Sequence, residues 1–202
     1  MSSKDASSIY GNPILKTPSI DRIGAEGARF DDFFVTNSLC APSRAAYLTG
    51  LYSHRNGVTT NGFGDPFRNQ GGLREDQETF VSLLHDAGWY TGLIGKWHLR
   101  SVPSGFDQWA IFPGGGGPYL DPPVNANGVN LRMRGHSDDI VGDQTLEFLD
   151  KRPKDRPFLL LMNFKSPHRN WVPAKRFESA FDDIDIPLPR TYEDRLDTDA
   201  LR

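Results

Sequence analysis

The amino-acid sequence predicts an α/β fold, in which helices flank a mostly parallel sheet with a site on its C-terminal edge. Three predicted strands, over residues 30–36, 89–94 and 157–163, support this fold because each leads directly into chemically active side chains. The third strand is a near-continuous apolar run, which is typical of a strand buried on both faces of a parallel sheet. Ligands of open α/β sheets gather where strands end, so we expect the three strand ends to form one site.

The composition indicates a soluble globular chain with one sizeable core. Its 202 residues are 37% hydrophobic and 24% charged, with a formal net charge of −3. Such a mild charge gives no reason to expect nucleic acid or a membrane surface as a partner. No apolar run is long enough to span a bilayer, and residues 1–5 lack the apolar core of a signal peptide. The single cysteine cannot form an internal disulfide.

The first predicted helix begins at Pro18, with Thr17 as its N-cap. Proline fits the first helical position because no N–H is needed there, and Gly27 ends the helix. Ile20 and Ile23 form its apolar side.

The predicted strand over residues 30–36 leads into a second predicted helix over residues 43–48. Pro42 suits the first position of that helix because its φ angle is preset. Asp31 and Asp32 are candidate metal ligands on residue type alone, but a solvent-side or turn location explains them more simply.

A loop over residues 53–73 is rich in Gly, Asn and Arg. Its His54, Arg55 and Arg68 could touch a substrate, although solvation at the surface is the simpler interpretation. The next helix spans residues 78–87 by the spacing of its apolar side chains, and the following glycine caps it.

Residues 105–123 are predicted to be irregular, with the tetraglycine segment 114–117 at their centre. No strand–glycine–helix context supports a phosphate-binding loop here, so we expect a flexible loop near the substrate mouth.

The last predicted helix spans residues 138–149 and is capped by Ser137 or Asp138. His136, Asp138 and Asp139 resemble a small metal cluster, but helix capping accounts for them better.

The chain's only cysteine lies in Cys40-Ala41-Pro42-Ser43-Arg44. Arg44 follows Cys40 by four residues, so its guanidinium can fold back along the same helix face. The positive end of the helix dipole also favours anionic groups near this cysteine. A lone cysteine is more often a small buried hydrophobe than a nucleophile, so the spacing alone does not decide its role.

Gly95-Lys96-Trp97-His98 comes directly after the strand over residues 89–94. In an extended segment Lys96 and His98 project to one side, because they are two residues apart. Together they suit a sulfate: the lysine can hold oxygens, and the histidine can relay a proton near neutral pH. On these grounds alone a surface lysine is the simpler view of Lys96. His168 likewise lies just past a strand.

Cys40-Ala41-Pro42-Ser43-Arg44, followed by Leu48-Thr49-Gly50, resembles the signature of the type I, formylglycine-dependent sulfatases. The Gly95-Lys96-Trp97-His98 segment resembles a second sulfatase signature, and Pro167-His168 is similar to a third segment. The resemblance extends from residue 10 to about residue 189. It implies an alkaline-phosphatase-like sandwich, with a mostly parallel central sheet flanked by helices, and hydrolysis of sulfate monoesters.

The resemblance also implies that Cys40 is modified. In sulfatases a formylglycine-generating or equivalent maturation enzyme reads a segment that corresponds to Cys40, Pro42, Ser43 and Arg44. It oxidises the cysteine to an aldehyde, whose hydrate has two hydroxyls on one carbon. One hydroxyl attacks sulfur, and the other then expels sulfate by restoring the carbonyl.

Roles for the other site residues follow from the same resemblance. Arg44 stabilises the hydrate, Lys96 binds the sulfate, His98 orients the nucleophile, and His168 assists the leaving oxygen. Cys40, as formylglycine, is also a ligand of a divalent metal, for which oxygen-ligated Ca²⁺ or Mg²⁺ fits.

The chain is therefore expected to be the N-terminal portion of a sulfatase catalytic domain over residues 1–202, without the first strand and the C-terminal part. The family's other metal ligands would lie upstream of residue 1 and downstream of residue 202, with a second lysine. Residues 171–202, rich in proline and charge, would form an extended connector. On this basis we expect the chain alone to be inactive or very weakly active.

Two alternatives and the substrate remain open at this point. A phosphonate or phosphate ester hydrolase would keep the fold and the aldehyde. A truncated, non-catalytic relic or an anion-binding module would keep Cys40 as a thiol. Sulfated carbohydrates, aryl sulfates and sulfolipids are all candidate substrates, and the resemblance favours a periplasmic, secreted or lysosomal location.

Overall fold

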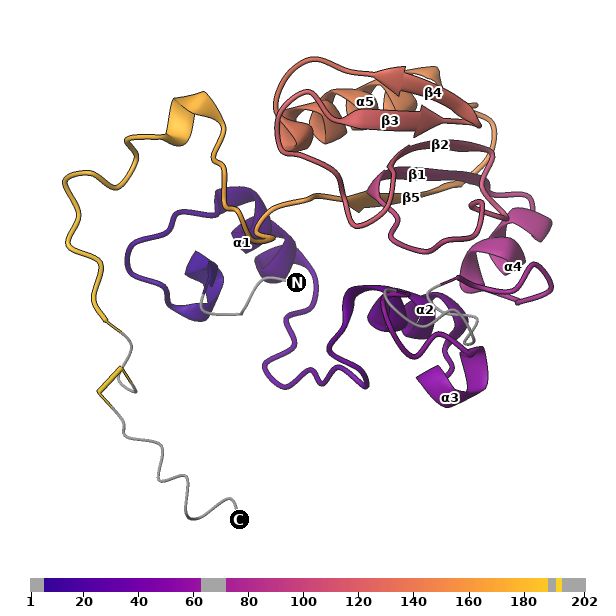
Figure 1. Cartoon of the computed structure of the whole chain (residues 1–202), viewed down its shortest axis with the longest axis horizontal. Helices are drawn as coiled ribbons and strands as arrows, with labels where there is room; N and C mark the ends of the chain where they lie inside the picture. The colour runs from indigo at the N-terminus through magenta and orange to yellow at the C-terminus, as the bar shows by residue number, and fades with distance from the viewer. Residues whose placement is uncertain (1–5, 63–71, 189–191, 194–202) are drawn as a thin grey trace, which may run out of the picture. The chain divides into compact units, whose positions relative to one another are not determined.

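The computed structural model describes residues 6–62, 72–188 and 192–193, and the chain divides into two compact units, residues 1–171 and 172–202. Figure 1 shows the elements of the first unit. In chain order they are η2 (Ser8–Tyr10), α1 (Pro18–Glu26), α2 (Cys40–Thr49), α3 (Ser53–Asn56), α4 (Phe80–Asp86), β1 (Tyr90–Lys96), β2 (Gln108–Phe112), β3 (Pro123–Ala126), β4 (Val129–Arg132), α5 (Ser137–Lys151) and β5 (Phe158–Asn163).

The strands form one sheet in the order β4-β3-β2-β1-β5. β1 lies between β2 and β5 and is parallel to both. β3 is antiparallel to β2, and β4 is antiparallel to β3, so four of the five described strands run in one direction. The predicted mostly parallel α/β sheet is therefore confirmed.

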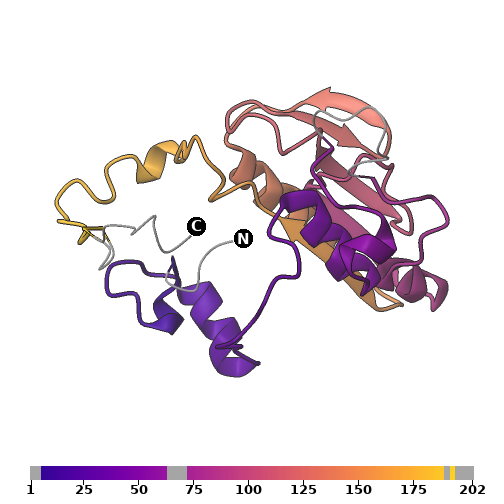
Figure 2. The same cartoon turned by 60° about the horizontal axis from the view of Figure 1, so that its bottom comes forward.

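Side-chain alternation along the strands gives the sheet two buried faces, because successive residues point to opposite sides. Leu93 and Ile111 lie on the face that α2 and α4 cover, whereas Ile94 and Phe112 lie on the face that α5 covers. Figures 1 and 2 show the resulting three layers, with the sheet between α5 and the helices α2 to α4. The helix residues in these cores are Ala41, Ala45, Leu48 and Val81 on one side and Ile140, Val141 and Phe148 on the other.

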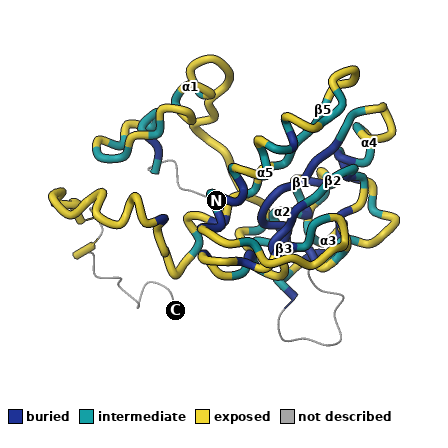
Figure 3. Tube along the Cα trace, turned by 90° about the horizontal axis from the view of Figure 1, so that it is seen from above, coloured by how far each residue is buried: buried dark blue, intermediate teal, exposed yellow. Residues whose placement is uncertain are grey.

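Strand β1 is the most buried strand, as Figure 3 shows, and two glycines allow this. A Cβ at Gly92 would lie 2.4 Å from the ring of Phe148, so glycine lets α5 pack closely. Gly95 has a φ angle of 98°, and its Cβ would lie 2.0 Å from the carbonyl oxygen of Asn163. The missing side chains of Gly92 and Gly95 therefore let α5 and β5 lie close to β1, and Gly95 is the residue before Lys96.

The predicted strand over residues 30–36 is absent, because this segment has no neighbouring strand among the described residues. Its Phe33 and Phe34 are 77% and 86% exposed. Helix α2 begins at Cys40 rather than at residue 43, which makes Pro42 its third residue. Proline is tolerated there because the first backbone bond of the helix is donated by the Ser43 N–H to the Leu39 carbonyl, at 3.0 Å.

Residues 105–123 are not wholly irregular, since β2 lies within them. The hairpin of β3 and β4 was also not predicted, although Asn127-Gly128 is a strong signal for a two-residue turn. Both turn residues have positive φ angles, 46° and 89°.

The structure corrects two further predictions, the cap of α5 and the burial of β5. Helix α5 is capped by His136, whose Nδ1 accepts the Asp138 N–H at 3.3 Å, rather than by Ser137 or Asp138. Strand β5 packs on both faces as predicted, with Leu159 and Leu161 against one core and Phe158 and Leu160 against the other, but it lies at the edge of the described sheet and is only partly buried.

The helix at residue 18 agrees with its prediction at both ends, although none of its residues is buried. Helix α4 is slightly shorter than expected, because a capping box of Thr79 and Ser82 fixes its start.

The second unit contains one short 3₁₀ helix, η3 (Lys175–Phe177), among its described residues. Most of its described side chains are exposed. Within the described ranges of the whole chain, no helix has the length and apolar character needed to cross a bilayer.

Candidate functional site

Cys40 is the first residue of α2, and the helix holds it beside the sheet. Ala41 and Ala45 are fully buried, which anchors the first turn in the core. The N–H of Ala41 donates to Oδ1 of Asn61 at 2.9 Å, so one of the unpaired N–H groups at this helix end has a partner. The Cys40 thiol is half-buried and forms no disulfide.

Lys96, the last residue of β1, contacts this thiol directly. Its Nζ lies 3.6 Å from the Cys40 Sγ, although its side chain is only 4% exposed. Arg44, one turn further along α2, donates from its guanidinium to the carbonyl oxygen of Lys96 at 2.8 Å. The end of the strand and the start of the helix are thus tied together, and they bring two cations to one cysteine.

Electrostatics in this corner favour an anion. Burial lowers the pKa of Lys96, the positive charges of Arg44 and Lys165 lower it further, and Cys40 opposes the effect. The pKa of Arg44 is also lowered, chiefly by burial. A negatively charged ligand would offset this accumulated positive charge, as would a thiolate.

His98 lies two residues past β1 in the left-handed conformation, with a φ angle of 57°. Burial lowers its pKa to about 4, and the charges of Lys96, Arg44 and His168 act in the same direction. The imidazole is therefore neutral near pH 7. A Cβ at Gly115 would lie 3.4 Å from its Nε2, so the predicted tetraglycine loop passes directly over this histidine.

His168 lies on a turn that follows β5, and its N–H donates to the carbonyl of Lys165 at 3.1 Å. Its Nδ1 is 3.3 Å from the carbonyl oxygen of Arg169. Because a carbonyl can only accept, Nδ1 carries the proton and Nε2 is the free nitrogen of the neutral ring. Burial lowers the pKa of His168, and the bond to Arg169 partly opposes this.

The structure adds two residues that sequence reasoning missed, Lys165 and Tyr119. Lys165 is 8% exposed, and its Nζ lies 4.6 Å from the centre of the Tyr119 ring. A Cβ at Gly116 would lie 3.5 Å from Lys96 and 3.9 Å from Lys165, so both lysine stems flank the glycine loop. The signal for Lys165 was present, because it lies two residues past β5, as His98 does past β1.

The structure thus brings Cys40, Arg44, Lys96 and His98 into one corner, and places His168 within electrostatic reach of Lys96 and His98. This arrangement places two cations beside the cysteine, and their combined positive charge favours an anion at this corner.

Other candidate clusters play different parts. Asp138 serves the backbone, because its Oδ1 accepts the N–H groups of Lys165 and Ser166 at 2.9 and 3.4 Å. Within the described ranges, no three His, Cys, Asp or Glu side chains are grouped so as to hold a metal, which includes the cluster around His136. Arg68 lies outside the described residues.

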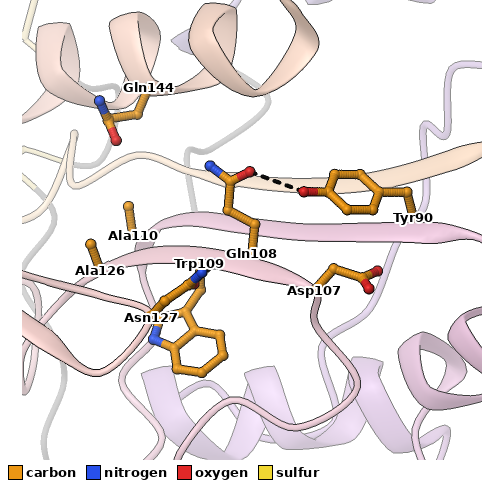
Figure 4. Close-up of a pocket in the computed structure, with 8 residues that line it drawn as sticks. All are labelled: Tyr90, Asp107, Gln108, Trp109, Ala110, Ala126, Asn127 and Gln144. Carbon is orange, nitrogen blue, oxygen red and sulfur yellow. Dashed lines mark hydrogen bonds between the residues drawn. The ribbon is translucent and has the colours of Figure 1, made fainter. Parts of the chain in front are cut away.

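A hollow of about 270 Å³ lies at the opposite end of the strands, as Figure 4 shows. Tyr90 and Gln108, the first residues of β1 and β2, meet there through a hydrogen bond of 3.3 Å, and Gln144 lies above them. Asp107 is its one charged lining residue, so this hollow lacks the cations that surround Cys40.

Comparison with known proteins gives a consistent result. A family model described as sulfatase matches residues 2–198. The chain is 42% identical over 191 residues to an N-acetylglucosamine-6-O-sulfatase of Bacteroides thetaiotaomicron, covering 94% of this chain and 33% of the relative. It is 32% identical to the human N-acetylgalactosamine-6-sulfatase, covering 84% of this chain and 38% of the relative.

A solved structure in complex with its substrate, D-glucosamine-2-N,6-O-disulfate, has a TM-score of 0.86 to this chain at 41% identity. The match covers 94% of this chain and 37% of that chain. A second solved structure, in complex with k-i-k-neocarrahexaose, has a TM-score of 0.79 at 26% identity and covers 90% and 46%. The chain spans about a third of the length of the curated relatives it matches.

Proposed function

Because this chain belongs to the sulfatase family, we propose that the site around Cys40 serves the hydrolysis of sulfate monoesters. The observation that carries the proposal is the 3.6 Å contact between the Lys96 ammonium and the Cys40 thiol. It brings the candidate nucleophile and the candidate sulfate ligand to adjacent positions. The Arg44 guanidinium stabilises this geometry through the Lys96 carbonyl.

Binding of the ester is the task of the cations. The Lys96 ammonium and the Arg44 guanidinium come from different elements and are largely removed from water, which strengthens their attraction for an anion. Gly115 and Gly116 bring the loop close to His98 and Lys96 without adding side chains at this corner.

The surroundings of Cys40 fit an aldehyde hydrate better than a thiol. Lys96 offers ammonium donors beside the side chain, and donors of this kind bind oxygen more strongly than neutral sulfur. When present, formylglycine supplies a nucleophilic hydroxyl at this position. The motif Cys40-x-Pro42-Ser43-Arg44 is proposed to direct the maturation enzyme to this residue.

The two histidines are proposed to divide the proton transfers. Neutral His98 can accept or share a proton at the nucleophile, because its pKa of about 4 keeps it unprotonated near pH 7. His168 presents Nε2 as its free nitrogen, which suits protonation of the leaving oxygen. A bound anionic ester would raise the pKa of His168, since it offsets the positive field of Lys96 and Lys165.

Sulfatases generally use formylglycine with a divalent metal, but the described residues of this chain do not fit a complete metal site. Oxygen-ligated Ca²⁺ or Mg²⁺ needs several carboxylates or carbonyls, and the nearest charged groups to Cys40 are cations. The prediction that the chain alone turns over little substrate stays open.

For the substrate we propose a 6-O-sulfated amino sugar. The support is the pair of relatives named as 6-sulfatases of N-acetylated amino sugars and the solved relative bound to a 6-O-sulfated glucosamine.

The test uses the full chain produced together with a formylglycine-generating enzyme. Mass spectrometry of the tryptic peptide over residues 30–44 should show that Cys40 has lost its sulfur and become an aldehyde. Calorimetric titration should show binding of N-acetylglucosamine 6-sulfate but not of N-acetylglucosamine, and Lys96→Met should abolish it. Equal or tighter binding of the 6-phosphate would favour a phosphate ester hydrolase.

Turnover is measured in the same preparation with the sugar sulfate and an aryl sulfate, with Ca²⁺ or Mg²⁺ added. Cys40→Ala is the matched blank, because it removes the modifiable side chain and leaves the cations in place. An unmodified thiol at Cys40 after co-production, with no sulfate ester bound, would contradict the proposal.

A further inference from the structure

The hydroxyl of Tyr119 is aimed at the turn that carries His168. Tyr119 is 4% exposed, and its Oη donates to the His168 carbonyl oxygen at 2.6 Å. The same hydroxyl also has a hydrogen bond with the Ser166 side chain. Its ring has two close neighbours, because it stacks on His136 with 5.4 Å between ring centres and its centre lies 4.6 Å from the Lys165 ammonium. The direction of this O–H is therefore fixed by packing.

Asp138 holds the other end of the same turn. Its Oδ1 accepts the N–H groups of Lys165 and Ser166 at 2.9 and 3.4 Å. Asp138 and Tyr119 belong to one piece of backbone structure, since the Ser137 N–H donates to the Tyr119 carbonyl at 2.7 Å. Asp138 thus binds the first two N–H groups of the turn, and Tyr119 binds its last carbonyl. We call these two connected residues the support of the turn.

This support bears on the imidazole of His168. The ring's Nδ1 reaches the Arg169 carbonyl at 3.3 Å only if the backbone between the two residues keeps its conformation. The Tyr119 bond to the carbonyl of His168 acts on the peptide unit between them. Releasing that carbonyl would let this peptide unit rotate and carry the Arg169 acceptor away from Nδ1.

We propose that Tyr119 is a positioning residue, which keeps His168 in its Nδ1–H tautomer with Nε2 free. That the free Nε2 serves the leaving oxygen rests on the proposed function, whereas the tautomer itself does not. The tautomer proposal and the proposed function can therefore fail separately. Spectroscopy without substrate tests the tautomer, whereas binding and turnover test the function.

The experiment records long-range ¹H–¹⁵N spectra of the histidine side chains in the full chain, at a pH where the rings are neutral. His168 is assigned by the signal lost in His168→Gln. Tyr119→Phe removes only the hydroxyl and keeps the ring against His136. Tyr90→Phe is the matched control, because it removes a hydroxyl bonded to Gln108 at the other end of the sheet.

In the wild type we expect His168 to be mainly the Nδ1–H tautomer. Tyr119→Phe should shift the tautomer ratio toward Nε2–H by about fivefold, the typical effect of one hydrogen bond, while Tyr90→Phe leaves it unchanged. A ratio in Tyr119→Phe within twofold of the wild type would overturn the proposal. So would a wild-type His168 that is mainly Nε2–H.

If Tyr119→Phe does not fold, 4-aminophenylalanine at position 119 decides the matter, because its amine restores a donor at the same place. A folded chain with the wild-type ratio supports the proposal. A folded chain with the tautomer ratio of free histidine overturns it. If this variant also misfolds, the wild-type spectrum decides, and a wild-type His168 that is mainly Nε2–H overturns the proposal.

Discussion

At the carboxyl end of β1, Lys96 and Arg44 meet the Cys40 thiol, whereas at its amino end Tyr90 and Gln108 border a hollow without cations. Both ends offer polar groups beside the same strand. They differ in how their cations are placed: Lys96 and Arg44 meet at the thiol, whereas at the amino end the Arg156 guanidinium lies 5.2 Å from the centre of the Tyr90 ring and does not line the hollow. The comparison teaches that a hollow alone does not make an anion site; converging cations with partly removed solvent do.

The largest expected difference between the two ends concerns their glycines. Gly95→Ala places a Cβ 2.0 Å from the Asn163 carbonyl oxygen at a φ angle of 98°, so we expect a loss of more than about 4 kcal/mol of unfolding free energy, or no folding. Gly88→Ala, with a φ angle of 89° and nothing within 4 Å, should cost only about 1–2 kcal/mol. Urea denaturation measures the unfolding free energy of both variants. Equal losses in the two would contradict the clash expected between a Cβ at position 95 and the Asn163 carbonyl.

The next difference concerns acid stability. His98 has a pKa of about 4 when folded and an ordinary value of 6.5, so the unfolded chain takes up this proton first as the pH falls. Stability should therefore decline between about pH 6.5 and pH 4, by about 2 kcal/mol once partial exposure is allowed for. His98→Asn should remove this part of the decline, whereas His85→Asn near the amino end should keep it. Denaturation at a series of pH values measures how steeply the unfolding free energy of each variant falls with pH.

A smaller effect is expected for anion binding. Lys96→Met should weaken the binding of inorganic sulfate at least tenfold, about 1.4 kcal/mol, because it removes the ammonium beside Cys40. Lys151→Met is the control, since Lys151 lies exposed on α5 and pairs with Glu147. Calorimetry gives both affinities. A similar loss in the two variants would mean that sulfate responds to overall charge rather than to this site.

The smallest effect belongs to the amino end. The ring nitrogens of His85 lie 3.5 Å from a carboxylate oxygen of Asp86 and 3.6 Å from one of Asp107, and its side chain is 44% exposed. His85→Asn should therefore change the unfolding free energy by about 0.3 kcal/mol and leave sulfate binding unchanged. An effect on sulfate affinity would show that the two ends of β1 are coupled.

Much of the fold was predictable because its main signals are local. The apolar run before residue 164 and the helical spacing after His136 each identify one element from its own residues. The Asn127-Gly128 turn was equally local, and the hairpin could have been predicted from it. The strand expected at residues 30–36 failed for a different reason: a strand needs a neighbour, and apolar residues alone do not show that one is present.

The proximity of candidate site residues was predictable where they are close in sequence, as Cys40 and Arg44 are on one helix. Tyr119 was missed because its contacts lie across the fold, whereas Lys165 had a local signal, its position shortly after a strand. Tyr119 reaches His168 over 49 residues, and no spacing rule connects them. Asp138 binds the backbone of another segment, and that contact could not be predicted because it depends on the tertiary structure.

The half-buried strand β5 has a consequence for how the protein behaves in solution. Its outer edge pairs with no strand among the described residues, and its sequence Phe158-Leu-Leu-Leu-Met-Asn carries neither charge nor proline. Such an edge is a template on which a second chain can add its own strand. At this edge of the described sheet, the backbone of β5 can therefore accept a further strand, and its uncharged sequence does not oppose that addition.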